Sequence, residues 1–116
     1  MNADKVDFAI KDGEGLTFVI FWNWDSKEYW SFAMLDGDEG YQVERDEQSF
    51  RVDGGVTTAT LANDCLSLKL SASSARVLSC PEEVQISLAR ISDGCAGALA
   101  ALKHILGDKL TVAAAN

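Results

Sequence analysis

The sequence predicts an α+β fold that is mostly β: a curved antiparallel sheet of about six to eight strands with one C-terminal helix packed on it. Three observations predict it. Short segments of alternating apolar and polar residues follow one another as far as Leu70, as in strands that bury one face. Turns rich in Gly, Asn and Asp separate them. Apolar residues near the C-terminus recur instead at helical spacing. Because helices do not alternate with the strands, a parallel sheet is not expected.

The first three strands are expected at residues 5–10, 16–22 and 29–35. The second is an unbroken run of mainly β-branched and aromatic residues, which predicts a central strand buried on both faces. The third places Trp30 and Phe32 on one side. Polar and glycine-rich turns are expected between and after these strands, at residues 12–15, 23–27 and 36–40.

Residues 41–47 alternate with charges on one face, which predicts a half-exposed edge strand. We expect residues 50–52 to continue this strand after a bulge. Two further strands are expected at 56–61 and 65–70. The turns before them are predicted at residues 53–55 and 63–64.

Two helices are predicted in the remaining part. Residues 71–78 are rich in Ala and Ser and predict a short helix, placed before a penultimate strand at residues 83–88. Ser92 or Asp93 can cap a second helix that runs to about Leu106 and is stopped by Gly107. A last short strand is expected at residues 110–112. The apolar stripe of the second helix comprises Cys95, Ala98, Leu99, Leu102, Ile105 and Leu106.

Size and charge restrict the function. The 116 residues predict a single domain, 1–116. The formal net charge of -8 and the lack of a basic patch argue against nucleic acid and against anionic membranes as partners. The N-terminus lacks the cationic and long apolar segments of a signal peptide. Cys65, Cys80 and Cys95 have no close pair, which is typical of buried free thiols in a reducing cytosol. A cytoplasmic protein is therefore expected.

Catalytic chemistry is not indicated. His104 is the single histidine, and no neighbouring residue in sequence would orient it as a base. The segment 36–40 lacks the third ligand and the glycine position of a calcium loop, so a plain hairpin turn is the better interpretation. No phosphate-binding or cofactor motif occurs. The sequence thus predicts a protein that is not an enzyme, with no metal and no cofactor.

Charge is concentrated in residues 25–48, which hold eight acids but only Lys27 and Arg45 as bases. Aromatic residues such as Trp24 and Tyr29 are interleaved with these acids. Such a surface suits a basic protein partner, because acids steer the encounter and aromatics supply affinity. The alternative is that the aromatics belong to the core and the acids to a solvated face. The candidate partner contacts are Asp36, Asp38, Glu39, Tyr41, Glu44, Asp46 and Glu47.

Three segments carry a family resemblance: Tyr41 to Gln48, Gly54-Gly55-Val56, and Leu66 to Leu70. In this order and spacing they resemble the immunity protein 10 family of bacterial polymorphic toxin systems. The similarity extends over residues 29–90, and it departs from the family pattern between Gln48 and Gly54. It implies a mostly β protein that binds and neutralises a cognate toxin.

Two alternatives stay open at this point. A chaperone for a secreted effector is also small and acidic, although such chaperones usually begin with a helix. A curved β cup that binds a small molecule is the other. Sequence leaves the toxin, the contacting face and the oligomeric state undetermined.

Overall fold

The computed structural model describes residues 1–10, 16–35, 40–91 and 94–112, without the side chains of Leu35 and of residues 47–49. The expected turn at 12–15, most of the turn at 36–40, and the expected cap residues Ser92 and Asp93 lie outside these residues. The described part of the chain forms nine strands and two α-helices. The predicted class, mostly β with a C-terminal helix packed on the sheet, is confirmed.

The first five strands form one antiparallel sheet in the order of the chain. Opposite residues lie on the same face, so Phe21 beside Trp30 and Val19 beside Phe32 build one apolar side. The strands are β1 (Lys5–Ala9), β2 (Leu16–Trp22), β3 (Tyr29–Leu35), β4 (Gln42–Arg45) and β5 (Glu47–Asp53).

A second, four-stranded sheet has the order β8-β7-β6-β9. Its last strand pairs parallel to β6, and its other pairs are antiparallel. Asn63 and Asp64 adopt left-handed φ values of 52° and 59° and form the two-residue turn between β6 and β7, as these residue types readily do. The strands are β6 (Val56–Ala62), β7 (Cys65–Leu70), β8 (Glu83–Ser87) and β9 (Leu110–Val112).

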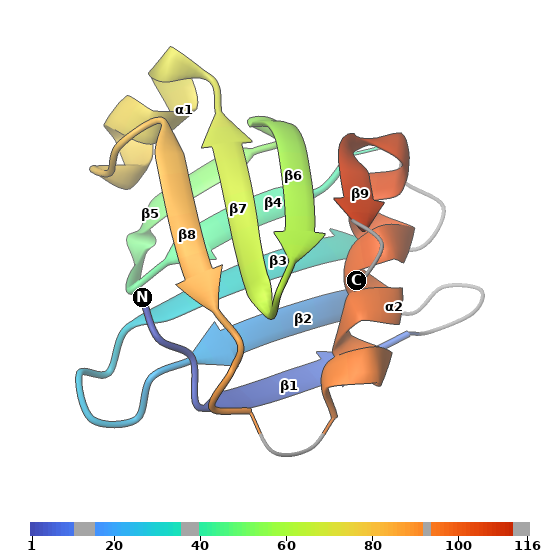
Figure 1. The fold of residues 1–116 in the computed structure, drawn as a ribbon. Helices are drawn as coiled ribbons and strands as arrows, with labels where there is room; N and C mark the ends of the chain where they lie inside the picture. The colour runs from blue at the N-terminus through green and yellow to red at the C-terminus, as the bar shows by residue number, and fades with distance from the viewer. Residues whose placement is uncertain (11–15, 36–39, 92–93, 113–116) are drawn as a thin grey trace.

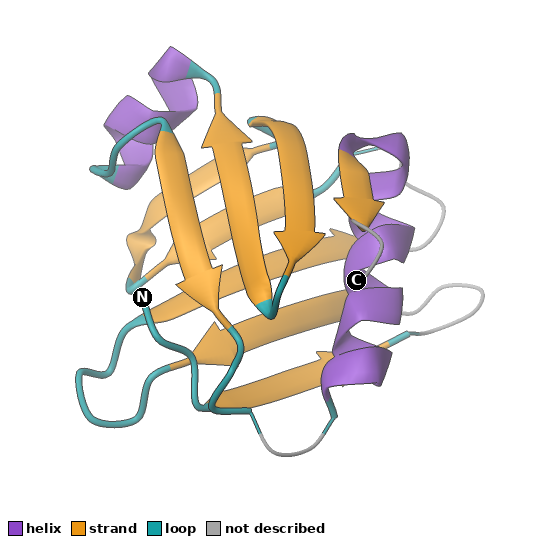
Figure 2. Ribbon diagram, in the orientation of Figure 1, coloured by secondary structure: helices purple, strands orange, loops and turns teal. Residues whose placement is uncertain are grey.

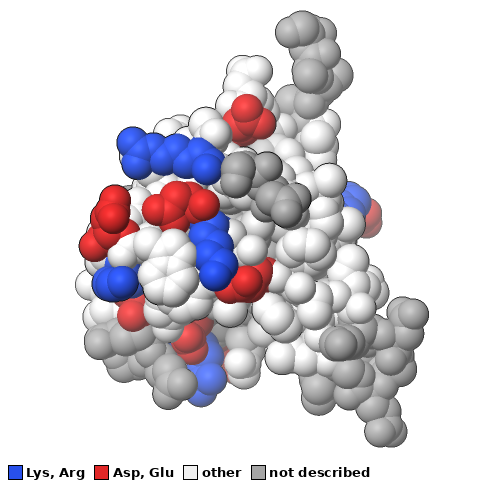
Figure 3. Space-filling view, turned by 90° about the horizontal axis from the view of Figure 1, so that it is seen from below, with Lys and Arg blue, Asp and Glu red and all other residues white. Residues whose placement is uncertain are grey.

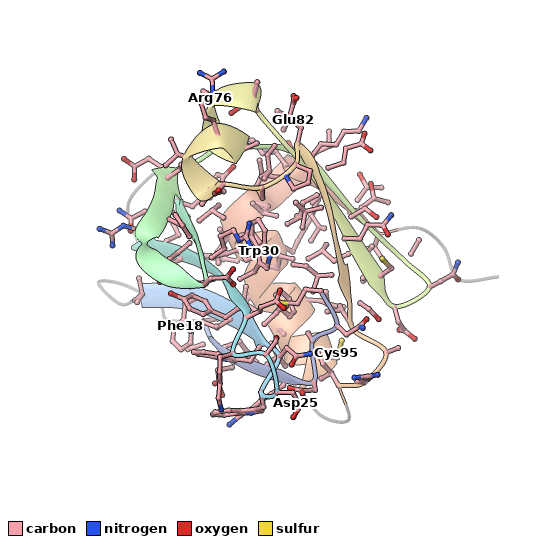
Figure 4. All side chains as sticks on the ribbon, turned by 90° about the vertical axis from the view of Figure 1, so that its left-hand side faces the viewer. Phe18, Asp25, Trp30, Arg76, Glu82 and Cys95 are labelled. Carbon is pink, nitrogen blue, oxygen red and sulfur yellow. The ribbon has the colours of Figure 1, made fainter. Side chains whose placement is uncertain are left out.

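The two sheets are stacked face to face, and their strands cross at a steep angle (Figure 1). Large side chains fill the space between them. Trp30 points into this space in Figure 4, and the rings of Phe21 and Phe32 meet edge to face, 6.4 Å between centroids. The largest fully buried side chains are Phe21, Phe32, Leu66, Leu68, Leu78, Ile86, Leu102, Val19, Val43 and Thr17.

The two helices sit at opposite sides of the stack (Figure 2). Helix α1 (Ala72–Leu78) is capped by Ser71, whose hydroxyl accepts from the Ser74 N–H at 3.3 Å. Helix α2 (Cys95–Leu106) packs on β1, β2 and β3 and is followed by the short 3₁₀ turn η1 (Gly107–Lys109). Its end at Gly107 is as predicted, and it begins at Cys95, after Gly94. Gly97 lets the helix approach β1, because a Cβ there would overlap the Phe8 ring.

One strand prediction was wrong. Residues 41–52 do not form a single bulged strand but a tight hairpin, in which β4 and β5 pair antiparallel. The chain reverses at Asp46, whose φ is 62°. Its carboxylate accepts from the Tyr29 N–H at 3.1 Å. A hydrogen bond to another strand therefore compensates for a conformation that is unfavourable for a residue with a Cβ.

Candidate functional site

Tyr41, one of the predicted partner contacts, lies in the core. It is only 9% exposed. Its hydroxyl accepts from the Val56 N–H at 3.1 Å and lies 3.4 Å from the Val56 carbonyl oxygen. Burial raises the pKa of this phenol above its ordinary value, against the opposing effect of the Val56 hydrogen bond. The ring thus ties β4 to the start of β6 and does not belong to the surface.

Two predicted acids, Glu44 and Asp46, are held inside the protein's own hydrogen bonds. Both are half-buried. Glu44 accepts from the Tyr29 hydroxyl, and Asp46 accepts from Arg45 at 2.7 Å as well as from the Tyr29 N–H. These carboxylates therefore stabilise the pairing of β3 with β4, and a lysine in place of Asp46 would place a cation beside Arg45.

Arg45 extends this network to the other layer. Its guanidinium lies 5.8 Å from the Trp30 ring and donates to the carbonyls of Leu78 and Ser79 at 3.3 and 3.0 Å. A cation at the C-terminus of α1 is favourable, because carbonyls there lack helical partners. Substitution of Asp46 by Lys should therefore destabilise the hairpin, because the hydrogen bonds of its carboxylate to Tyr29 and Arg45 would be lost.

The remaining predicted contacts cannot be placed. Asp36, Asp38 and Glu39 lie outside the described residues, as does the side chain of Glu47. The hairpin predicted there in place of a calcium loop stays a prediction.

A surface that the sequence did not single out lies on the far side of the five-stranded sheet. We call it the outer face; it faces away from the core and from α2. Figure 4 shows Phe18 pointing out of the stack where Trp30 points in, and no described helix or strand lies beyond it. Leu16 is 45% exposed. From the strand register, the centre of the outer face comprises Ala9, Leu16, Phe18, Ile20, Trp22, Tyr29, Ser31 and Ala33. Charged residues on the same side of the sheet flank this centre: Lys5, Asp7, Glu44 and Arg51.

At one end of the outer face, Trp22, Trp24 and Tyr29 form what we call the aromatic corner. The Trp22 ring is stacked with that of Trp24 at 6.0 Å and tilted against that of Tyr29 at 5.0 Å, between centroids. Trp24 is 50% exposed. The indole nitrogen of Trp22 is buried and has no hydrogen-bond partner within the described ranges. Large amphipathic rings of this kind dominate protein–protein contacts.

The loop that carries Trp24 is held by specific hydrogen bonds. Asn23 accepts from the Ser26 N–H at 2.9 Å and donates to the Asn2 carbonyl at 2.7 Å. The Asp4 carboxylate accepts from the Trp24 N–H at 3.2 Å. Lys27 takes a left-handed φ of 64°. Trp24 is therefore presented by a fixed backbone, which lowers the entropy that binding would otherwise cost.

Charges of both signs surround the aromatic corner. Lys5 and Lys27 place their ammonium groups 5.1 and 4.9 Å from the Trp24 ring centroid, within the range of a cation–π contact. Asp25 and Glu28 on the same loop are exposed. Figure 3 shows Lys, Arg, Asp and Glu interleaved on one side of the molecule. The local surface is thus mixed, and less uniformly acidic than the sequence count suggested.

Histidine and cysteine side chains of the described residues lie elsewhere on the molecule, outside this surface. Across the described ranges, no three His, Cys, Asp or Glu side chains gather as a metal ion would require. His104 is exposed near the end of α2. The three cysteines are free thiols but half-buried rather than fully buried. Burial raises the pKa of the Cys80 and Cys95 thiols, and Arg45 opposes this effect at Cys80.

None of the helices in the described part of the chain has the length and apolar content needed to cross a lipid bilayer. No protein-family model, curated protein or solved structure matches this chain. The resemblance to the immunity protein 10 family therefore stays a prediction from the sequence.

Proposed function

We propose that this chain binds and neutralises a cognate bacterial protein toxin, and that the outer face with its aromatic corner is the surface that the toxin contacts. The observation that carries the proposal is an apolar sheet face left uncovered by the described part of the chain, with Trp24 half-exposed at its end. Continuous apolar patches of this kind typically mark interaction sites.

The form of this face suits a protein partner better than a small molecule. It runs across three neighbouring strands, and its side chains lie in rows set by the strand register. The space between the two sheets is instead filled by side chains such as Phe21 and Phe32. A flat apolar centre with a polar border is the usual anatomy of a protein–protein interface.

Exposed charges of both signs border this face: the acids Asp7, Asp25, Glu28 and Asp53, and the bases Lys5, Lys27 and Arg51. The support for a basic partner is the formal charge of -8 on the whole chain. A net negative charge attracts a basic partner and raises the association rate. A toxin that acts on nucleic acid would have the matching basic surroundings. The toxin itself is inferred only from the resemblance of residues 29–90 to an immunity family.

The test begins with affinity capture of the tagged chain from the host that makes it, with mass spectrometry of whatever remains bound at moderate salt. The captured partner is then expressed alone and together with this chain in a sensitive host. We expect growth arrest by the partner alone and recovery when both are made. A partner that is harmless alone would refute the toxin assignment, and a failure to capture any stoichiometric partner would refute the binding function.

A further inference from the structure

Strand β1 is an edge of the five-stranded sheet, and within the described residues it pairs only with β2. Its side chains are unusually accessible for a strand that packs on a helix: Lys5 and Asp7 are exposed, and Phe8 is 38% exposed. Unpaired backbone groups along such an edge can accept a further strand.

The charges on β1 restrict which strand can pair with its edge. Lys5 and Asp7 both lie on the outer face, because they stand opposite Trp22 and Ile20 of β2. A lone charge on an edge discourages pairing. Opposite charges two positions apart can instead pair with the same two charges on an identical strand that runs antiparallel to the first.

We propose that two copies of this chain join through β1, antiparallel, about a two-fold axis that passes through Val6 and continues the two sheets as one. In this register Lys5 stands opposite Asp7 of the second copy, and symmetry repeats the pair. On the inner side Val6 meets Val6 of the second copy as a directly opposed apolar pair. The inference does not rest on the proposed toxin binding.

Charge also excludes the neighbouring registers. Moving the axis to Lys5 would place the two lysines opposite each other, and moving it to Asp7 would do the same for the two carboxylates. Like charges directly opposite each other are destabilising. Of the three registers centred on Lys5, Val6 and Asp7, only the one centred on Val6 avoids both repulsive pairs.

Sedimentation equilibrium over a wide range of protein concentration tests this proposal. We expect the mass to approach twice the 12.5 kDa of one chain as concentration rises. Lys5→Asp or Asp7→Lys alone should weaken the association by roughly tenfold or more, because symmetry counts each repulsive pair twice. The double substitution Lys5→Asp with Asp7→Lys restores complementary pairs and should restore the dimer.

Lys69→Asp is the matched control. Lys69 is an exposed strand lysine on the four-stranded sheet, 3.7 Å from Glu83, and its substitution should leave the mass unchanged. Circular dichroism of each variant separates loss of association from loss of folding. A wild-type chain that stays monomeric at every concentration would overturn the proposal. So would a dimer that survives the single substitutions, or folded variants in which the double substitution fails to restore it.

Discussion

Replacing Gly55 with alanine should destabilise the protein by about 2–5 kcal/mol, from backbone strain and overpacking together. Gly55 has a φ of 97°, which side-chain-bearing residues rarely adopt, and an added Cβ would lie 2.8 Å from the Cβ of Ser74 and closer still to its hydroxyl. The position matters because Gly54 and Gly55 connect β5 of one sheet to β6 of the other. The Gly55 carbonyl also accepts a hydrogen bond from the N–H of Ser71, the N-cap of α1, at 2.9 Å.

Gly54→Ala is the matched control for this prediction. Gly54 has a φ of 67°, but a Cβ there would meet nothing within 4 Å. It should cost only the left-handed conformation, about 1–2 kcal/mol. Urea unfolding of both variants gives the comparison. Equal destabilisation by the two would show that the contact between Gly55 and α1 does not limit the packing of the sheets.

Replacing Trp24 with alanine should weaken binding of the captured partner by roughly 30-fold or more, the loss expected for an interface hot spot. Trp24 is half-exposed, stacked with Trp22 and held on a hydrogen-bonded loop. A ring presented in this way contributes contact area at little cost in entropy. Isothermal titration calorimetry with the purified partner measures the change directly.

Val77→Ala is the control for Trp24→Ala. Val77 is also 50% exposed, but it lies on α1, away from the outer face. Its substitution should leave the affinity unchanged. If the two variants bind equally well, or if Val77→Ala is the weaker binder, the aromatic corner is not the anchor of the interface.

Much of the fold could be predicted because apolar periodicity and turn residues agree for most elements. Two examples are the alternation of apolar and polar residues from Leu66 to Leu70 and the helix that Gly107 stops. The hairpin at Asp46 could not be predicted from local sequence. It contains no glycine, and its turn depends on hydrogen bonds between Asp46 and Tyr29 that form only in the folded sheet.

The candidate site was harder to predict, for a different reason. Residues 16–22 are apolar on both faces, which indicates a strand covered on both sides. In the structure the second sheet and α2 cover only the side of Val19 and Phe21. Which side stays open depends on where the second sheet packs, and no local pattern encodes that. Glu44 and Asp46, by contrast, are prominent in the sequence as part of an acidic segment. In the structure they accept hydrogen bonds from Tyr29 and so stabilise the fold.

The central claim is that the outer face binds the partner, and hydrogen–deuterium exchange with and without the captured partner tests it most directly. The account predicts that added protection falls on residues 16–31, which include most of the outer face and the loop that carries Trp24. Exchange in β7 and β8 of the other sheet should stay unchanged. Protection confined to the four-stranded sheet or to α1, with none on β2 or residues 23–28, would contradict the account.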